Sequence, residues 1–131
     1  MAYIFITNNS IDVKDMLDNK KASAYLPYTG PKVEKIIKND LIFIYRTESG
    51  IIAYGYSNGQ NIINRQCNSG LKSTHEDYVI LDKFIVLKTP ITFSFCSTKV
   101  LRVLLIKFLR LFGNIFSYCP ITSVRISVIR Q

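Results

Sequence analysis

Two short segments rich in β-branched and aromatic residues, joined by a tight turn, constrain the fold of this chain more than any other feature. The segments are Leu41–Arg46 and Ile51–Tyr56, and the residues between them, Thr47–Gly50, end in a glycine. β-Branched and aromatic residues favour extended strands, and a short connection that contains glycine is typical of a hairpin. The sequence therefore predicts an antiparallel strand pair in the middle of the chain.

Further segments with the composition of strands, helices or loops flank this hairpin. Strands are expected over Tyr3–Thr7, Tyr78–Lys88 (ended by Pro90) and Ile121–Ile129. Helical structure is expected from Ser10 or Asp12 to Asp18, over Lys32–Lys38, and from Ser97 or Thr98 to Phe112. Loops or turns are expected over Lys20–Pro31 and Ser57–Gln60, and a loop or a short irregular strand is expected over Asn61–Thr74. This order predicts one α+β domain over residues 1–131, with a mixed, strongly curved five- or six-stranded sheet or pseudo-barrel and two or three helices.

The first predicted helix sets an expectation for the direction of its side chains. Its apolar residues are expected to turn toward the core, and these are Ile11, Val13 and Met16. Its carboxylates recur every three residues and are interpreted as surface charge, and these are Asp12, Asp15 and Asp18.

The positive charge of the chain is confined to its last third. Residues 1–82 hold nine Lys and Arg and nine Asp and Glu, whereas residues 83–131 hold eight Lys and Arg and no carboxylate, which accounts for the net charge of +8. A field polarised in this way attracts polyanions, either nucleic acid or an anionic membrane surface. The alternative is a solvated basic face that serves solubility.

The helix predicted near the C-terminal end carries four of these basic residues. At 100° per residue, they fall within about 140° of arc, and they are Lys99, Arg102, Lys107 and Arg110. Three interpretations stay open: a core-packed helix whose basic stripe faces phosphates, an ordinary solvated stripe, or insertion into a membrane surface. The apolar face could also form a homodimer through residues 99–112. Because basic residues interrupt the apolar run, we expect no segment that spans a bilayer.

No set of residues predicts catalysis or metal binding. The single histidine, His75, lies beside Glu76 and Asp77 and could act as a general acid or base. No nucleophile in a recognisable motif and no second histidine accompany it, so a solvated loop histidine is the simpler interpretation. The three cysteines form no Cys-x-x-Cys pair, which favours free thiols in a reducing compartment. We therefore expect no catalytic residue, no metal and no cofactor, and a cytoplasmic protein without a signal peptide.

Tyrosines supply the second indication of function, because the chain has eight of them and no tryptophan. Several fall where a loop or strand end would expose them, and these are Tyr25, Tyr28, Tyr45, Tyr54 and Tyr56. Aromatic rings near basic groups stack on nucleobases, with about 1–3 kcal/mol for each stack. Burial in the core is the alternative, and it suits Tyr25 and Tyr28 least because they lie beside Pro27 and Gly30 in a predicted loop.

The central segment resembles the helix–turn–strand element of the PUA-like superfamily, and of EVE-type domains in particular. Lys35–Tyr45 matches the family's pattern of lysine, turn and alternating hydrophobic residues ending in tyrosine, and Gly50–Tyr56 matches its Gly-Ile-x-Ala-x-Gly strand. Asn39 stands where the pattern has glycine, and asparagine accepts a left-handed conformation. The strands expected at both ends of the chain fall in a compatible order, so the resemblance covers nearly the whole chain.

The resemblance implies a pseudo-barrel whose aromatic-lined pocket receives a base, often a modified one, from a nucleic acid. By position, the implied pocket residues are Tyr25, Tyr28, Thr29, Tyr45, Arg46 and Tyr56. The residues expected to hold phosphates are Lys99, Arg102, Lys107, Arg110 and Arg125. We therefore expect a non-catalytic nucleic-acid-binding module. The alternatives are a protein-interaction module that dimerises through residues 99–112 and an enzyme of the same fold, similar to ASCH-type nucleases or amidohydrolases.

Overall fold

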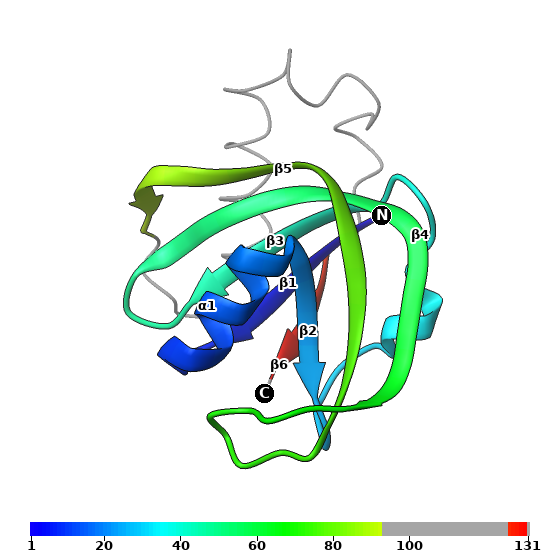
Figure 1. Cartoon of the computed structure of the whole chain (residues 1–131). Coiled ribbons are helices and arrows are strands. Elements are labelled where there is room, and N and C mark those ends of the chain that lie inside the picture. The colour runs from blue at the N-terminus through cyan, green and yellow to red at the C-terminus, as the bar shows by residue number, and fades with distance from the viewer. Residues whose placement is uncertain (93–125, 131) are drawn as a thin grey trace.

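The structure is a computed structural model that describes residues 1–92 and 126–130, and these residues form one curled sheet of six strands (Figure 1). In chain order the elements are β1 (Ala2–Thr7), α1 (Ser10–Asn19), β2 (Lys21–Tyr25), the short 3-10 helix η1 (Val33–Lys35), β3 (Leu41–Arg46), β4 (Gly50–Gln66), β5 (His75–Ile91) and β6 (Ile126–Arg130). The expected α+β class with a mixed, curved sheet is confirmed. Within the described residues there is one α-helix, and the helix expected up to Phe112 lies outside them.

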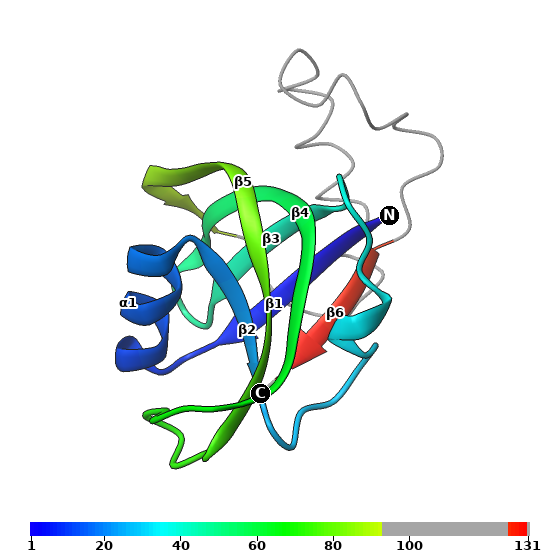
Figure 2. The same cartoon turned by 45° about the vertical axis from the view of Figure 1, so that its right-hand side comes forward.

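The strand order β2-β5-β4-β3-β1-β6 places the first strand, β1, beside the last, β6. β1 is parallel to both β3 and β6, while the remaining neighbours are antiparallel. The curl also brings the segment after edge strand β2 to the opposite edge strand, because Thr29 and Arg130 exchange two backbone hydrogen bonds of 3.0 Å each. Figures 1 and 2 show β4 and β5 bending around the molecule, so each of these long strands contributes to two sides of the curled sheet.

The predicted central hairpin is confirmed. Arg46 pairs with Gly50 across β3 and β4, and the Ser49 amide donates to the Arg46 carbonyl at 3.0 Å. Gly50 has a φ of 107°, and a Cβ there would overlap the backbone of Ile91, so this position requires glycine. Asn39 has a φ of 71°, which is the left-handed conformation expected for the turn before β3.

Both long strands continue beyond their predicted limits. The turn predicted over Ser57–Gln60 is wrong, because β4 passes through these residues with a shift in its register against β5 and continues to Gln66. Such an irregularity accommodates polar residues and Gly59 without ending the strand. β5 begins at His75 and passes Pro90, which the ladder tolerates because the paired residues skip from Val86 to Ile91.

The loop predicted over Lys20–Pro31 is also wrong in its first half. Residues Lys21–Tyr25 form β2, which pairs with β5 from Lys21↔Ile80 to Tyr25↔Glu76, and all five residues of the strand are buried. The polar residues in this short segment hid its strand character. Its alternation of Ala22 and Ala24 with polar neighbours is the period-two pattern of a strand, and packing against the rest of the molecule covers both of its faces.

α1 differs from the prediction in its cap and in two of its side chains. Asn9, rather than Ser10 or Asp12, caps the helix, because its Oδ1 accepts from the amides of Ile11 and Asp12 at 3.0 and 3.3 Å. Ile11 is exposed (62%) and Asp12 is buried (1%), the reverse of the expected directions, because Asp12 accepts hydrogen bonds from Ser69 Oγ and the Gly70 amide. Val13 and Met16 are buried as expected.

Alternate residues of the sheet form two separate apolar clusters. The inner cluster lies on the concave side and includes Phe5, Ile42, Ile44 and Leu81, with Met16 of α1 packed among them. The outer cluster lies on the other face and includes Ile4, Leu41, Phe43, Tyr45, Tyr54 and Tyr56. Figure 2 shows α1 beside the curl, next to β2. The sheet therefore has apolar side chains on both faces, as its nearly uninterrupted hydrophobic strands require.

Candidate functional site

The most strongly built polar site surrounds Glu76 near the start of β5. Glu76 lies directly between Tyr25 of β2 and Arg65 of β4 in the sheet, and Tyr78 follows it on the same face. These side chains form the floor of a hollow of about 420 Å³, which we call the Glu76 hollow. Its lining residues are Asp15, Asn19, Lys21, Tyr25, Arg65, Gln66, Cys67, Asn68, Glu76, Tyr78 and Ile80.

A buried lysine joins two carboxylates at the floor of the hollow. Lys21 Nζ lies 3.0 Å from Glu76 Oε1 and 3.0 Å from Asp15 Oδ2. The side chains of Lys21 and Glu76 are only 9% and 4% exposed, whereas that of Asp15 is 44% exposed. Burial by itself lowers the pKa of Lys21, but the hydrogen bonds to Glu76 and Asp15 outweigh it and raise the pKa above its usual value. Lys21 is therefore a permanent cation and hydrogen-bond donor at neutral pH.

The second carboxylate oxygen of Glu76 has no hydrogen-bond partner within residues 1–92 and 126–130. Oε1 accepts from Lys21, but Oε2 is buried and meets no donor. An unpaired buried acceptor costs about 1–3 kcal/mol, and more when the group is charged. Because Glu76 lines the hollow, Oε2 can accept from an N–H group of a ligand that displaces a lining side chain.

The other residues that line the hollow include the aromatic rings of Tyr25 and Tyr78 and the thiol of Cys67. The Tyr78 ring has Lys21 Nζ 4.5 Å from its centroid and Arg65 Cζ at 5.7 Å, and Arg65 Nη1 also donates to the Tyr78 hydroxyl. Burial, with the charge of Asp12 as the next cause, raises the pKa of Tyr25. Burial and then Glu76 raise the pKa of Cys67, so its thiolate is disfavoured and the thiol is a poor nucleophile.

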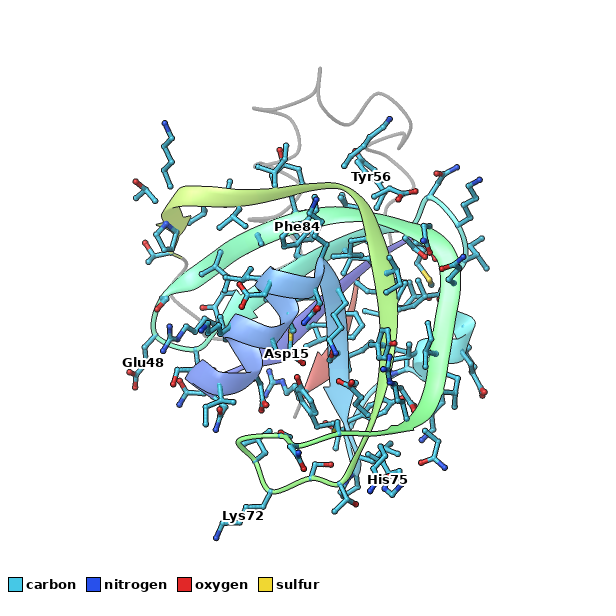
Figure 3. The ribbon with its side chains drawn as sticks, in the orientation of Figure 1. Asp15, Glu48, Tyr56, Lys72, His75 and Phe84 are labelled. Carbon is cyan, nitrogen blue, oxygen red and sulfur yellow. The ribbon has the colours of Figure 1, made fainter. Side chains whose placement is uncertain are left out.

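The wall of the hollow is held in place by the buried carboxylate of Asp12. Ser69 Oγ donates to Asp12 Oδ2 at 2.8 Å, and the Gly70 amide donates to Oδ1 at 2.9 Å. These bonds fasten α1 to the loop between β4 and β5, which carries Cys67 and Asn68. On the other side of the wall, Asn19 Nδ2 donates to Asp15 Oδ1 at 2.7 Å, and Figure 3 shows Asp15 on α1 beside β2. The site is thus preorganised by the hydrogen bonds of Asp12 and by the bond between its lining residues Asn19 and Asp15.

The structure separates the tyrosines that were predicted to share one pocket. Tyr25 and Tyr28 are buried with the inner cluster, while Tyr45 and Tyr56 belong to the outer cluster on the opposite face of the sheet. Among them, Tyr25 lines the Glu76 hollow and a second hollow of about 310 Å³ beside Pro27. The sequence-based interpretation of an exposed loop failed because β2 and the segment after it pack against β5 and β6.

Tyr28 has an internal structural role. Its hydroxyl donates to Asp77 Oδ2 at 2.9 Å and accepts from the Val33 amide at 3.1 Å. The other Asp77 oxygen accepts from the Asn64 amide at 2.7 Å. Burial comes first among the causes that raise the pKa of Tyr28 to about 12. The ring is 9% exposed, so a base cannot stack on it without displacing its neighbours.

The other predicted pocket residues lie apart. Thr29 is exposed and pairs with Arg130, and Arg46 is half-buried at the end of β3 beside the hairpin turn. Tyr56 lines a hollow of about 280 Å³ together with Asn39, Asp82 and Lys83, and Lys83 Nζ is 6.0 Å from the centre of its ring. Lys83 is the first of the eight basic residues in the last third of the chain. One predicted aromatic residue and one basic residue thus share a hollow.

Several predictions lie outside the described residues. These are the phosphate-binding residues Lys99, Arg102, Lys107, Arg110 and Arg125, and the dimer surface over residues 99–112. His75 is the first residue of β5 rather than a loop residue, with Thr74 Oγ1 2.9 Å from its Nδ1 (Figure 3). In the part of the chain that the structure describes, no group of His, Cys, Asp and Glu could hold a metal ion. No helix in that part is long and apolar enough to cross a membrane.

Of the residues that line the Glu76 hollow, only Tyr25 is among the pocket residues predicted from the sequence. Glu76, Tyr78 and Ile80 alternate along β5, but the predicted strand began at Tyr78 and did not include Glu76. The charges of Lys21 and Glu76 also look like ordinary surface charge in the sequence. The available signal was the alternation of Lys21, Ser23 and Tyr25 with two alanines, which places three polar side chains on one face of a short strand.

The chain was compared with models of protein families, with curated proteins and with solved structures, and none of the three comparisons found a match.

Proposed function

We propose that this chain is a non-catalytic nucleic-acid-binding module of PUA-like fold, in which the Glu76 hollow receives a base and the basic residues of the last third hold phosphates. The observation that carries the proposal is the buried Glu76 Oε2, which has no donor in the described part of the protein and belongs to a residue that lines a polar hollow. At about 420 Å³, the hollow falls in the range of small-molecule sites, about 300–1,000 Å³.

The charge of the chain supports a polymeric anion as the partner. The net charge of +8 comes from residues 83–131, which contain no carboxylate. Within the hollow, by contrast, Lys21 and Arg65 are matched by Asp15 and Glu76. Phosphate attraction therefore belongs to the basic segment, while the hollow offers a balanced set of donors and acceptors suited to a neutral base.

The chemistry of the hollow supports binding rather than catalysis. Lys21 is held protonated by two carboxylates, and the raised pKa of Cys67 keeps its thiol protonated. Neither group is a ready nucleophile or base at neutral pH. A group that acts in catalysis near neutral pH would need its pKa shifted toward 7, and these shifts have the opposite direction.

The proposal is tested by measuring the binding of labelled single-stranded RNA and DNA of mixed sequence at roughly 50–200 mM salt. Over this range of salt, proteins that make many phosphate contacts lose about 10³–10⁵ in affinity. We expect affinity to fall as salt rises. The Arg102→Ala/Arg110→Ala double variant should bind more weakly, with a slope reduced by roughly 1.4 on logarithmic axes, because each single-strand phosphate contact contributes about 0.7.

Two outcomes would contradict the proposal. One is the absence of binding to either nucleic acid at low salt, and the other is binding that does not respond to salt. A matched variant, Lys14→Ala/Lys72→Ala, removes the same charge from exposed positions in the charge-balanced part of the chain. It should leave the slope nearly unchanged, which separates a local phosphate contact from a loss of net charge. Tyr28→Ala is a poor probe, because it would break the buried bond to Asp77.

A further inference from the structure

We infer that the Glu76 hollow selects guanine, an inference that rests on the proposed function because it names the base that the hollow would receive. The basis is the juxtaposition of a cationic donor and a carboxylate with one unused oxygen. Lys21 Nζ and Glu76 Oε1 are 3.0 Å apart, and Oε2 of the same carboxylate is buried without a donor. A ligand edge that fits must place an acceptor opposite the lysine and donors opposite the carboxylate.

Guanine is the common base whose pairing edge has this order. Its O6 accepts, and the adjacent N1–H and N2–H₂ groups both donate. Adenine and cytosine place a ring nitrogen lone pair beside their amino group, and uracil and thymine flank a single N–H with two carbonyl oxygens. Against a carboxylate these acceptors are repelled, whereas the two neighbouring donors of guanine can reach both oxygens. Glu76 Oε1 can accept a second hydrogen bond because each carboxylate oxygen has two lone pairs.

The charges around Glu76 argue against a cationic ligand as the donor. An ammonium or guanidinium group would also satisfy Oε2, but Lys21 is already ion-paired to both Glu76 and Asp15, and Arg65 lies directly opposite Glu76 in the sheet. A third cation would be repelled by both side chains at short range. A neutral base supplies N–H donors without adding charge, and its carbonyl oxygen faces the existing cations.

The side chain that would admit the base is Arg65. Glu76 Oε2 is buried, so a ligand can reach it only when a lining side chain moves. Arg65 is exposed, comes from the neighbouring strand and lies over the Tyr78 ring, where it donates to the Tyr78 hydroxyl. Its long side chain can swing away and then contact the base carbonyl or the nucleotide phosphate from the rim. The other floor residues, Lys21 and Tyr78, are buried and fixed by their partners.

The experiment is isothermal titration calorimetry of the full chain with the 5′-monophosphates of guanosine, inosine, adenosine, cytidine and uridine. All five carry the same phosphate and ribose, so differences report the base. Inosine lacks only the N2 amino group of guanosine. We expect guanosine monophosphate to bind roughly tenfold more tightly than inosine monophosphate and ten- to a hundredfold more tightly than the other three. Because this series uses the unaltered protein, it does not depend on the folding of a variant.

A variant then assigns the selectivity to Glu76. Glu76→Gln keeps the shape of the side chain but replaces an acceptor with an N–H₂ donor. We expect this variant to reduce the ratio of affinities for guanosine monophosphate over the other nucleotides about tenfold. Glu48→Gln removes the same charge from the exposed turn between β3 and β4, labelled in Figure 3, and should keep the preference. Far-ultraviolet circular dichroism shows whether each variant is folded before its titration is interpreted.

The outcomes separate this inference from the proposed function. Equal binding of all five nucleotides, or of guanosine and inosine monophosphates, would overturn guanine selection. Salt-dependent binding of oligonucleotides without any selective nucleotide binding would also overturn it, while the nucleic-acid proposal would stand. Selective binding of guanosine monophosphate without oligonucleotide binding would uphold the guanine site and overturn the polymeric partner.

Discussion

The contact between Gly70 and Asn9 gives a stability prediction that can be worked out from the structure. Gly70 lies in the loop between β4 and β5, where its amide donates to the buried Asp12 carboxylate. A Cβ added at Gly70 would lie 2.5 Å from Asn9 Nδ2 and closer still to Oδ1. Oδ1 is the atom that caps α1 through the amides of Ile11 and Asp12. In Gly70→Ala the cap must move or the loop must lift from Asp12.

Both adjustments, the displacement of the Asn9 cap and the movement of the loop away from Asp12, destabilise the native state. Loss of an asparagine cap costs about 1 kcal/mol, and a weakened hydrogen bond to a charged group costs part of about 1.5–3 kcal/mol. We therefore expect Gly70→Ala to lower the free energy of unfolding by about 2 kcal/mol, with a drop in melting temperature of roughly 8 °C for a domain of this size. Urea unfolding followed by circular dichroism measures the change, with the m-value expected to stay constant.

A double-mutant cycle with Asn9→Gly tests the cause. Removing the Asn9 side chain costs only a few tenths of a kcal/mol, since glycine is an acceptable cap residue, and it opens the space that the new methyl group needs. In that background Gly70→Ala should be nearly neutral, because alanine also restricts the unfolded chain. The expected coupling is therefore about 2 kcal/mol. An equal cost of Gly70→Ala in both backgrounds would refute the steric explanation.

Two further predictions concern buried polar groups. Lys21→Met should lower the free energy of unfolding by about 3 kcal/mol, because it leaves Glu76 charged and buried without its cation. Urea unfolding measures the change. A loss of stability no greater than that of the exposed control Lys14→Met would contradict the prediction. Tyr28→Phe should flatten the loss of stability between pH 10 and about pH 12, because the native state holds the Tyr28 proton up to about pH 12 while the unfolded chain releases it near pH 10. The raised pKa means that stability is present below pH 10 and is lost as the pH rises, so an unchanged slope of unfolding free energy against pH would contradict the assignment.

The parts of the fold that could be predicted are those fixed by local sequence. Leu41–Tyr56 contains strand formers around a turn whose glycine is required by a φ of 107°, so each residue favours the hairpin that forms. The first strand and the helix after it follow from the same kind of local preference. The position of the helix start was missed by one to three residues, because Asn9, Ser10 and Asp12 are all good caps and only the packing of Asp12 against Ser69 and Gly70 selects among them.

The candidate site could not be predicted because its residues come together only when strands that are distant in the sequence pair. Lys21 and Glu76 are 55 positions apart in the chain, and each looks like an ordinary surface charge until β2 pairs with β5. Tyr28 presents the converse case, because its neighbours Pro27 and Gly30 indicate an exposed loop while its hydroxyl is buried against Asp77. Composition near a tyrosine does not reveal whether a distant strand supplies a partner for its hydroxyl.

Under the proposed function, the position of charge along the chain assigns affinity for a polyanion and selectivity among bases to different residues. The residues that give the chain its net charge are those from Lys83 onward, whereas the Glu76 hollow is built by residues of the charge-balanced part. Within the hollow, Lys21 is already neutralised by Asp15 and Glu76, so it can contribute little to the attraction of a polyanion. Salt should therefore weaken the binding of a polymer strongly and the choice among bases only slightly. If Glu76→Gln changes the base preference but not the salt dependence of binding, then affinity for the polymer and selectivity among bases come from separate parts of the chain.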